Sequence, residues 1–187
     1  KILRKAAEMG YKQFAYLPLF QEEGAKSEEP LILPEGKREI AMLTTQFLNS
    51  SHFSSMMLDR FQSEINHLHS CMTIHRISPA ELAEKKLPSS LNLERTAGII
   101  CFEVFDYDYA QMLCGLEIPL LFVDTPVMEM RPPLKADRLY MENRIEIQNA
   151  VAHMVECGKK RISFAGDKNH CQSFFERYMG YKDAVEY

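Results

Sequence analysis

The sequence predicts an α/β fold built on a buried parallel β-sheet with helices on both faces. Three apolar runs of strand length, at residues 97–102, 117–123 and 161–165, are separated by segments with the length and spacing of helices. Strands that alternate with helices in this way are typical of βαβ units. In sheets of this kind ligands bind at the carboxyl ends of the strands. Glu103, Asp124 and Asp167 follow the three runs, so the sequence favours a small-molecule binding site there.

Apolar spacing and turn residues predict the other elements. In chain order these are a helix at 1–9, a strand at 40–45, a helix at 54–68, a strand at 71–77, and helices at 79–87 and 109–116, followed by a strand at 137–141 and helices at 145–157 and from 173 onward. Ser78 is expected to cap the helix that starts at Pro79, because serine suits the N-cap and proline the first helical position.

Two of these helices have an apolar face that should point toward the core. The inward residues are expected to be Met57, Leu58, Phe61, Ile65 and Leu68 in the first, and Ile147, Val151, Met154 and Val155 in the second.

The composition is that of an ordinary globular protein of 187 residues, long enough for one large core or two modest ones. The net charge of −4 argues against strong nucleic-acid binding by the chain as it stands, since affinity for phosphate comes from Lys and Arg. The five cysteines are scattered, which favours reduced thiols in a cytoplasmic protein over disulfides or a zinc site. Neither a membrane span nor a signal peptide is recognisable.

No catalytic motif is recognisable in the sequence. It contains neither a Gly-x-Gly-x-x-Gly segment nor a phosphate-binding loop, and no Ser or Cys lies in a nucleophile-elbow context. His67 and His69 lie two residues apart on a helix and so point to different faces. We therefore expect no enzyme activity, no cofactor and no metal site.

Three motifs occur in order along the chain. Residues 2–11, Ile-Leu-Arg-Lys-Ala-Ala-Glu-Met-Gly-Tyr, form the first. Residues 98–100 followed by 118–124 form the second, and residues 158–166 followed by Arg177-Tyr178-Met179-Gly180-Tyr181 form the third. Together they resemble the lactose-repressor/galactose-repressor (LacI/GalR) family of bacterial transcription regulators. The first motif is similar to the last helix of that family's helix-turn-helix headpiece, and the other two are similar to its core.

The resemblance implies a periplasmic-binding-protein-like (type I) core of two lobes, with parallel sheets flanked by helices. It divides the chain into a headpiece remnant at 1–16, a linker or hinge at 17–37, a first lobe at 38–126, and a crossover with the start of an incomplete second lobe at 127–187. It implies a repressor whose affinity for operator DNA is controlled by a small-molecule effector, most commonly a sugar, bound between the lobes. It also implies a homodimer, with exposed apolar residues among Met56 to Leu68 as candidate contacts, and no membrane partner.

The sequence departs from the family pattern in three places. It begins inside the headpiece, without the recognition helix, and it ends partway through the second lobe. Pro18 and the acidic run at 21–29 disfavour the hinge helix that the family usually inserts into the minor groove.

Arg177 is the first of seven candidate effector-binding residues. Its planar guanidinium could donate a bidentate hydrogen bond to a hydroxyl pair or a carboxylate of the effector. The alternative is a solvated helix arginine paired with Glu176 or Asp183.

The other six candidates lie near strand ends or at a helix start. Phe53 could stack on the apolar face of a sugar or instead cover the following helix, and His52 precedes it. Glu103, Asp124 and Thr125 lie at the carboxyl ends of strands, where carboxylates suit hydroxyl-rich ligands, although Asp124 could equally make capping or hinge hydrogen bonds in the crossover. Asn143 is expected to be an N-cap rather than a direct contact.

Two other classes of function stay open. A sugar-binding transport or sensory module without DNA function would have the same core, because fold alone does not decide function. An α/β enzyme has less support, since no set of nucleophile, base and oxyanion donors is recognisable.

Overall fold

The structure, a computed structural model, describes residues 39–46, 52–67 and 70–186, and the side chains of the second of these ranges from Met56 onward. The expected headpiece remnant, the linker and the helix at 1–9 lie outside the described residues.

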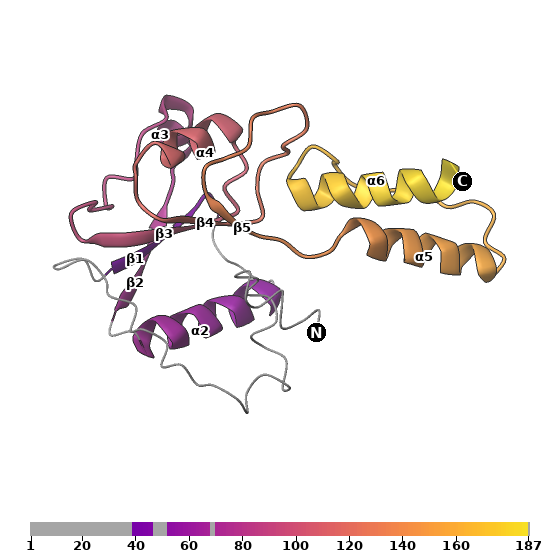
Figure 1. The fold of residues 1–187 in the computed structure, drawn as a ribbon, viewed down its shortest axis with the longest axis horizontal. Helices are drawn as coiled ribbons and strands as arrows, with labels where there is room; N and C mark the ends of the chain where they lie inside the picture. The colour runs from indigo at the N-terminus through magenta and orange to yellow at the C-terminus, as the bar shows by residue number, and fades with distance from the viewer. Residues whose placement is uncertain (1–38, 47–51, 68–69, 187) are drawn as a thin grey trace, which may run out of the picture. The chain divides into compact units, whose positions relative to one another are not determined.

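A five-stranded parallel sheet forms the centre of the described fold (Figure 1). The strand order is β2-β1-β3-β4-β5, and every neighbouring pair is parallel. The strands are β1 (Glu39–Thr44), β2 (Cys71–Arg76), β3 (Thr96–Phe102), β4 (Leu120–Val123) and β5 (Asp137–Leu139). The α/β class and the parallel sheet expected from the sequence are therefore confirmed.

Helices cover both faces of this sheet, α2 (His52–His67) one face, and α3 (Pro79–Glu84) with α4 (Tyr107–Cys114) the other (Figure 1). The side chains of β3 alternate between the two layers, as the pleat of a strand requires. Ile99 and Cys101 pack with α4, whereas Ile100 and Phe102 pack with α2.

The apolar face expected on α2 packs against the sheet. Met57, Leu58, Phe61 and Ile65 all contact the cluster formed by β1, β3 and β4, and Leu68 lies outside the described residues. Phe61 is therefore a core residue, and Met56, whose side chain is 72% exposed, remains as an apolar surface residue of this helix.

Local signals determine where α3 and α4 begin. Ser78 caps α3 in a full capping box with Glu81, and Pro79 occupies its first position, as the sequence predicts. The helix expected at 109–116 begins two residues earlier, because the Asp106 side chain accepts a hydrogen bond from the backbone N–H of Tyr109 at 2.8 Å.

Helices α5 (Arg144–Glu156) and α6 (Gln172–Glu186) run side by side after the last strand (Figure 1). Gly180 of α6 lies against the backbone of Arg144 at the start of α5. The Arg144 side chain also pairs with Asp183 of α6, at 2.6 Å. The two helices thus approach closely at one glycine and are joined there by an ion pair.

Two expectations for this part of the chain are wrong. Residues 161–165 do not form a strand, because no described segment offers them a backbone ladder, and Phe164 instead packs on Tyr178 and Tyr181. On α5 Val151 is buried, but Met154 and Val155 are 45% and 56% exposed, since no described element covers that end of the helix.

Candidate functional site

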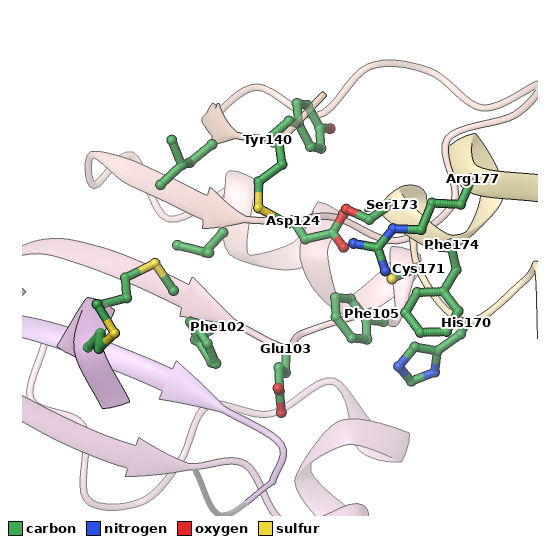
Figure 2. A pocket seen from close by; sticks show the side chains of 15 residues that line it. Phe102, Glu103, Phe105, Asp124, Tyr140, His170, Cys171, Ser173, Phe174 and Arg177 are labelled. Carbon is green, nitrogen blue, oxygen red and sulfur yellow. Dashed lines mark hydrogen bonds between the residues drawn. The ribbon is translucent and has the colours of Figure 1, made fainter. Parts of the chain in front are cut away.

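A cavity of about 700 Å³ lies where β3 and β4 end and α6 begins. It has the size of a pocket for a small molecule and lies at the sheet edge where ligands bind in parallel α/β folds. Figure 2 shows side chains from the sheet edge and from α6 directed toward the same space. Its walls are formed by Met56, Met57, Phe102, Glu103, Phe105, Val123, Asp124, Leu139, Tyr140, Met141, His170, Cys171, Ser173, Phe174 and Arg177.

Glu103 and Asp124 occupy equivalent places after neighbouring strands. Phe102 and Val123 are paired in the register of β3 and β4, so the two carboxylate residues follow side by side. Both have left-handed backbones, with φ of 56° and 61°. Such a conformation costs a residue other than glycine about 1–2 kcal/mol, and strain of this kind is concentrated at functional sites.

Asp124 joins the sheet to the first turn of α6. Its Oδ1 accepts hydrogen bonds from the backbone N–H groups of Thr125 at 2.8 Å and Ser173 at 3.2 Å. Asp124 thus makes hydrogen bonds of the capping or crossover kind that the sequence left open, and its carboxylate also lines the cavity.

The Cys171 thiol adds a further bond to the same carboxylate. Burial raises the pKa of this thiol to about 12, and the hydrogen bond to Asp124 raises it as well. The thiol stays protonated at neutral pH and so is a poor nucleophile. Although it lines the cavity, it is suited to holding Asp124 in place and not to covalent catalysis.

Three rings form an aromatic shelf along one wall, composed of Phe105, His170 and Phe174. The ring centroids of Phe105 and His170 are 5.0 Å apart, and those of His170 and Phe174 are 5.2 Å apart, both edge-to-face. Figure 2 shows the three rings grouped beside the Arg177 side chain. The Arg177 guanidinium lies 5.4 Å from the centre of the Phe174 ring.

Arg177 is held by Asn143 and not by a carboxylate. Its Nε donates to Asn143 Oδ1 at 2.9 Å. The alternative partners are engaged elsewhere: Asp183 pairs with Arg144, and Glu176 accepts from Asn143 Nδ2 at 3.3 Å. In the described part of the chain the guanidinium makes no ion pair, so its terminal nitrogens remain able to donate to a ligand.

Two other candidates lie behind the cavity wall. Thr125 is fully buried and does not line the cavity, and its hydroxyl bonds to the hydroxyl of the wall residue Tyr140 at 2.9 Å. Asn143 occupies the N-cap position of α5, but its side chain makes no capping bond. Glu142 Oε1 caps the helix by accepting from the N–H groups of Arg144 and Ile145, at 3.0 and 3.1 Å.

Asn143 is therefore the N-cap residue of α5, as expected, but its side chain binds Arg177 because Glu142 makes the capping hydrogen bonds. His52 and Phe53 are the first two residues of α2, and their side chains lie outside the described residues.

Sequence reasoning missed the aromatic shelf and Tyr140. The sequence signal for Phe105 is its position two residues after Glu103, beyond the end of a predicted strand. His170 and Phe174 have no such signal, because they reach the cavity only when α6 packs against the strand ends.

The described residues offer no site for a metal ion, since no three His, Cys, Asp or Glu side chains gather suitably among them. Within the same residues, no helix has the length and apolar character needed to cross a membrane.

The sequence matches no family model, and no curated protein sequence matches it. The fold does match solved structures. A transcriptional regulator, CelR, in complex with cellobiose has a TM-score of 0.66 at 16% identity, over 99% of this chain and 52% of that one. The lac repressor dimer bound to operator and the anti-inducer ONPF has a TM-score of 0.64 at 17% identity, over 81% and 52% of the two chains.

A third match is a periplasmic binding protein/LacI transcriptional regulator from Alkaliphilus metalliredigens QYMF, complexed with D-xylulofuranose. Its TM-score is 0.62 at 16% identity, over 80% of this chain and 53% of that one. The present chain thus spans about half the length of these structures. It has the periplasmic-binding-protein-like core fold of LacI-type transcriptional regulators.

Proposed function

We propose that this chain is the effector-binding part of a DNA-binding transcriptional regulator of the LacI/GalR type, and that its effector is a sugar. The observation that carries the proposal is the cavity at the ends of β3 and β4, where an aromatic shelf, two carboxylates and an arginine meet. The fold likeness to regulators solved with cellobiose and D-xylulofuranose supports the same class of ligand.

The chemistry of the walls suits a sugar ring. The shelf of Phe105, His170 and Phe174 offers an apolar surface on which the C–H face of a sugar can stack. The carboxylates of Glu103 and Asp124 can accept hydrogen bonds from hydroxyl groups, and charged acceptors form stronger bonds than neutral ones. Arg177, held by Asn143, can donate to the opposite edge of the ring, while His52 and Phe53 are proposed as further contacts from α2.

Ligand binding in this cavity can change the affinity of the protein for DNA. In this proposal residues 38–126 form a first lobe and residues 127–187 the crossover and the start of a second lobe. The backbone N–H of Gln172 donates to the carbonyl of Thr125 at 2.9 Å, and its side-chain Oε1 accepts from the N–H of Met128 at 2.9 Å. A ligand that bridges Glu103 and Arg177 spans this junction and can bias its geometry.

Coupling of about 1–3 kcal/mol would change operator affinity roughly 5- to 150-fold. Operator half-sites lie about one helical turn apart, so the proposal requires a homodimer that presents two headpieces. Residues 1–16 are proposed as the end of each headpiece.

A sugar-binding transport or sensory module is the second candidate, since one matching structure is described as a periplasmic binding protein as well as a LacI regulator. The two candidates agree on the ligand site and differ only in DNA binding. The Cys171 thiol in the wall stays protonated and is a poor nucleophile, which favours the regulator and the transport or sensory module over an enzyme.

The test uses the full-length protein in a thermal-shift screen against cellobiose, xylulose and a panel of related sugars. A ligand at about 100 times its Kd stabilises the fold by about 2.7 kcal/mol. Arg177→Ala should abolish the shift, whereas Lys182→Ala, on an exposed part of the same helix, should leave it unchanged. Equal shifts in both variants would contradict the assignment of this cavity.

A second measurement separates the two candidates. The ligand that gives the shift is added to a selection for palindromic DNA bound by the full-length protein. Selective DNA binding whose affinity changes with the ligand supports the regulator. A protein that binds the sugar but selects no DNA, with or without ligand, is the transport or sensory module.

A further inference from the structure

The start of α6 forms one wall of the cavity, with Cys171, Ser173 and Phe174 among the lining residues. The N-terminus of a helix is ordinarily a site for anions, because its first N–H groups are unpaired and its dipole is positive there. A ligand phosphate would be expected at such a position if these donors were free.

Here the donors of the first turn are already engaged by the protein. The N–H of Gln172 donates to the carbonyl of Thr125 at 2.9 Å, and that of Phe175 donates to the carbonyl of Cys171 at 3.0 Å. The N–H of Ser173 donates to the Asp124 carboxylate at 3.2 Å, and that of Phe174 to the Cys171 sulfur. The chain's own carboxylate therefore occupies the place that a ligand anion would take.

The other charged residues of the wall also disfavour an anionic ligand. Glu103 places a second carboxylate at the neighbouring strand end, and Arg177 is the one Lys or Arg among the lining residues described. One donor of that guanidinium is already used by Asn143. A phosphate brought into the cavity would meet two carboxylates for one arginine, and juxtaposed like charges repel one another.

We propose that this cavity selects an uncharged sugar and rejects the phosphorylated form of the same sugar, with Asp124 as the specificity-determining residue. The proposal rests on the proposed function, since it specifies the ligand class of the same site. The carboxylate of Asp124 accepts ligand hydroxyl hydrogens while it blocks the anion-binding end of α6.

Matched pairs of sugars test this proposal in the full-length protein. Calorimetric titrations at one fixed ionic strength compare cellobiose with its 6-phosphate, xylulose with xylulose 5-phosphate, and fructose with fructose 1-phosphate. The uncharged member of at least one pair should bind, and its phosphorylated partner should bind at least about 100-fold more weakly because of this repulsion.

Asp124→Asn removes the charge and keeps an oxygen that can accept the Ser173 N–H. It should reduce the discrimination between the two members of a pair by about tenfold or more, the effect of removing one close like charge. Glu129→Gln is the matched control, because it removes an exposed carboxylate that does not line the cavity. If Asp124→Asn does not fold, Glu103→Gln removes the other wall carboxylate and should change the discrimination in the same direction.

The possible outcomes separate the two proposals. A phosphorylated sugar that binds as tightly as its parent, or more tightly, overturns the inference and leaves the sugar-binding function standing. If Asp124→Asn reduces the discrimination between a sugar and its phosphate no more than Glu129→Gln does, the role of Asp124 is overturned. Binding of neither member in any pair overturns the proposed sugar effector, and the inference with it.

Discussion

Gly180 of α6 lies against the backbone of Arg144 in α5, and replacing it with alanine tests how Arg177 is held. A Cβ at this position would overlap the carbonyl oxygen of Arg144 and lie 3.1 Å from both its carbonyl carbon and its Cα. Carbon atoms in contact prefer a separation of about 3.5–4.0 Å, so the two helices must separate by roughly 0.5–1 Å. The obstacle is backbone, which cannot rotate away as a side chain can.

The expected cost follows from two opposing terms. Overpacking costs about 1–3 kcal/mol, and the upper part of that range applies because backbone must move. Removal of a glycine from a helix returns about 1 kcal/mol. The net loss is about 2 kcal/mol, which lowers Tm by about 4–8 °C for a chain of this size.

The substitution should also weaken ligand binding, although Gly180 does not line the cavity. Asn143 directly precedes Arg144, so separation of the helices lengthens the 2.9 Å bond between Asn143 and Arg177. Thermal and urea unfolding give the stability, and calorimetry with the sugar identified by the screen gives the affinity. Lys182→Ala, exposed on the same helix, should change stability by less than about 0.5 kcal/mol. A Gly180→Ala protein as stable as the parent, with unchanged affinity, refutes the reasoning.

Four further predictions concern stability. Tyr140→Phe leaves the buried hydroxyl of Thr125 without its partner and should cost about 1–3 kcal/mol in urea unfolding, whereas the double variant with Thr125→Val should recover part of that loss. Burial raises the pKa values of the Tyr109 phenol and the Cys171 thiol to about 12, so the folded chain keeps protons that the unfolded chain loses. The free energy of unfolding should therefore fall between about pH 9 and 12, and Cys171→Ala should reduce that fall; a flat profile would contradict the burial of these groups. Burial also lowers the pKa of His75 against the opposing effect of Glu39, so stability should fall as pH drops below about 6.5, and His75→Gln should flatten this acid limb. Glu117 has a left-handed backbone with φ of 55°, and Glu117→Gly should stabilise the fold by about 0.5–1 kcal/mol, while Gly158→Ala, at φ of 78°, should destabilise it; shifts of the same sign in both would contradict the account.

The predictions made from sequence succeeded where a local physical cause was present. Ser78 and Pro79 mark the start of α3 because a capping hydroxyl and a preset φ act within one helical turn. The strands β3 and β4 are recognisable because both of their faces are buried, so apolar residues run without interruption. The same logic failed at residues 161–165, where an apolar run finds no neighbouring strand among the described residues.

In the candidate site, too, the features with a local cause could be predicted and the others could not. Glu103 and Asp124 could be placed at the sheet edge from the sequence, because the end of a strand is a local feature. The exclusion of Thr125 from the cavity could not be foreseen, since it depends on Tyr140 lying within hydrogen-bond distance. The role of Asn143 also depends on a neighbour, because Glu142 takes over the capping of α5.

The sequence by itself determined the layers of this protein, because the periodicity of apolar residues and the chemistry of caps and turns act over a few neighbouring positions. Only the tertiary structure decided the composition of the cavity wall. Phe105 and His170 are 65 positions apart in the sequence, and their rings meet because α6 docks on the ends of β3 and β4. Arg177 is aimed by Asn143 because Gly180 allows α5 and α6 to touch at the backbone. Contacts of this kind depend on where whole elements pack, and no local pattern of residues encodes that placement.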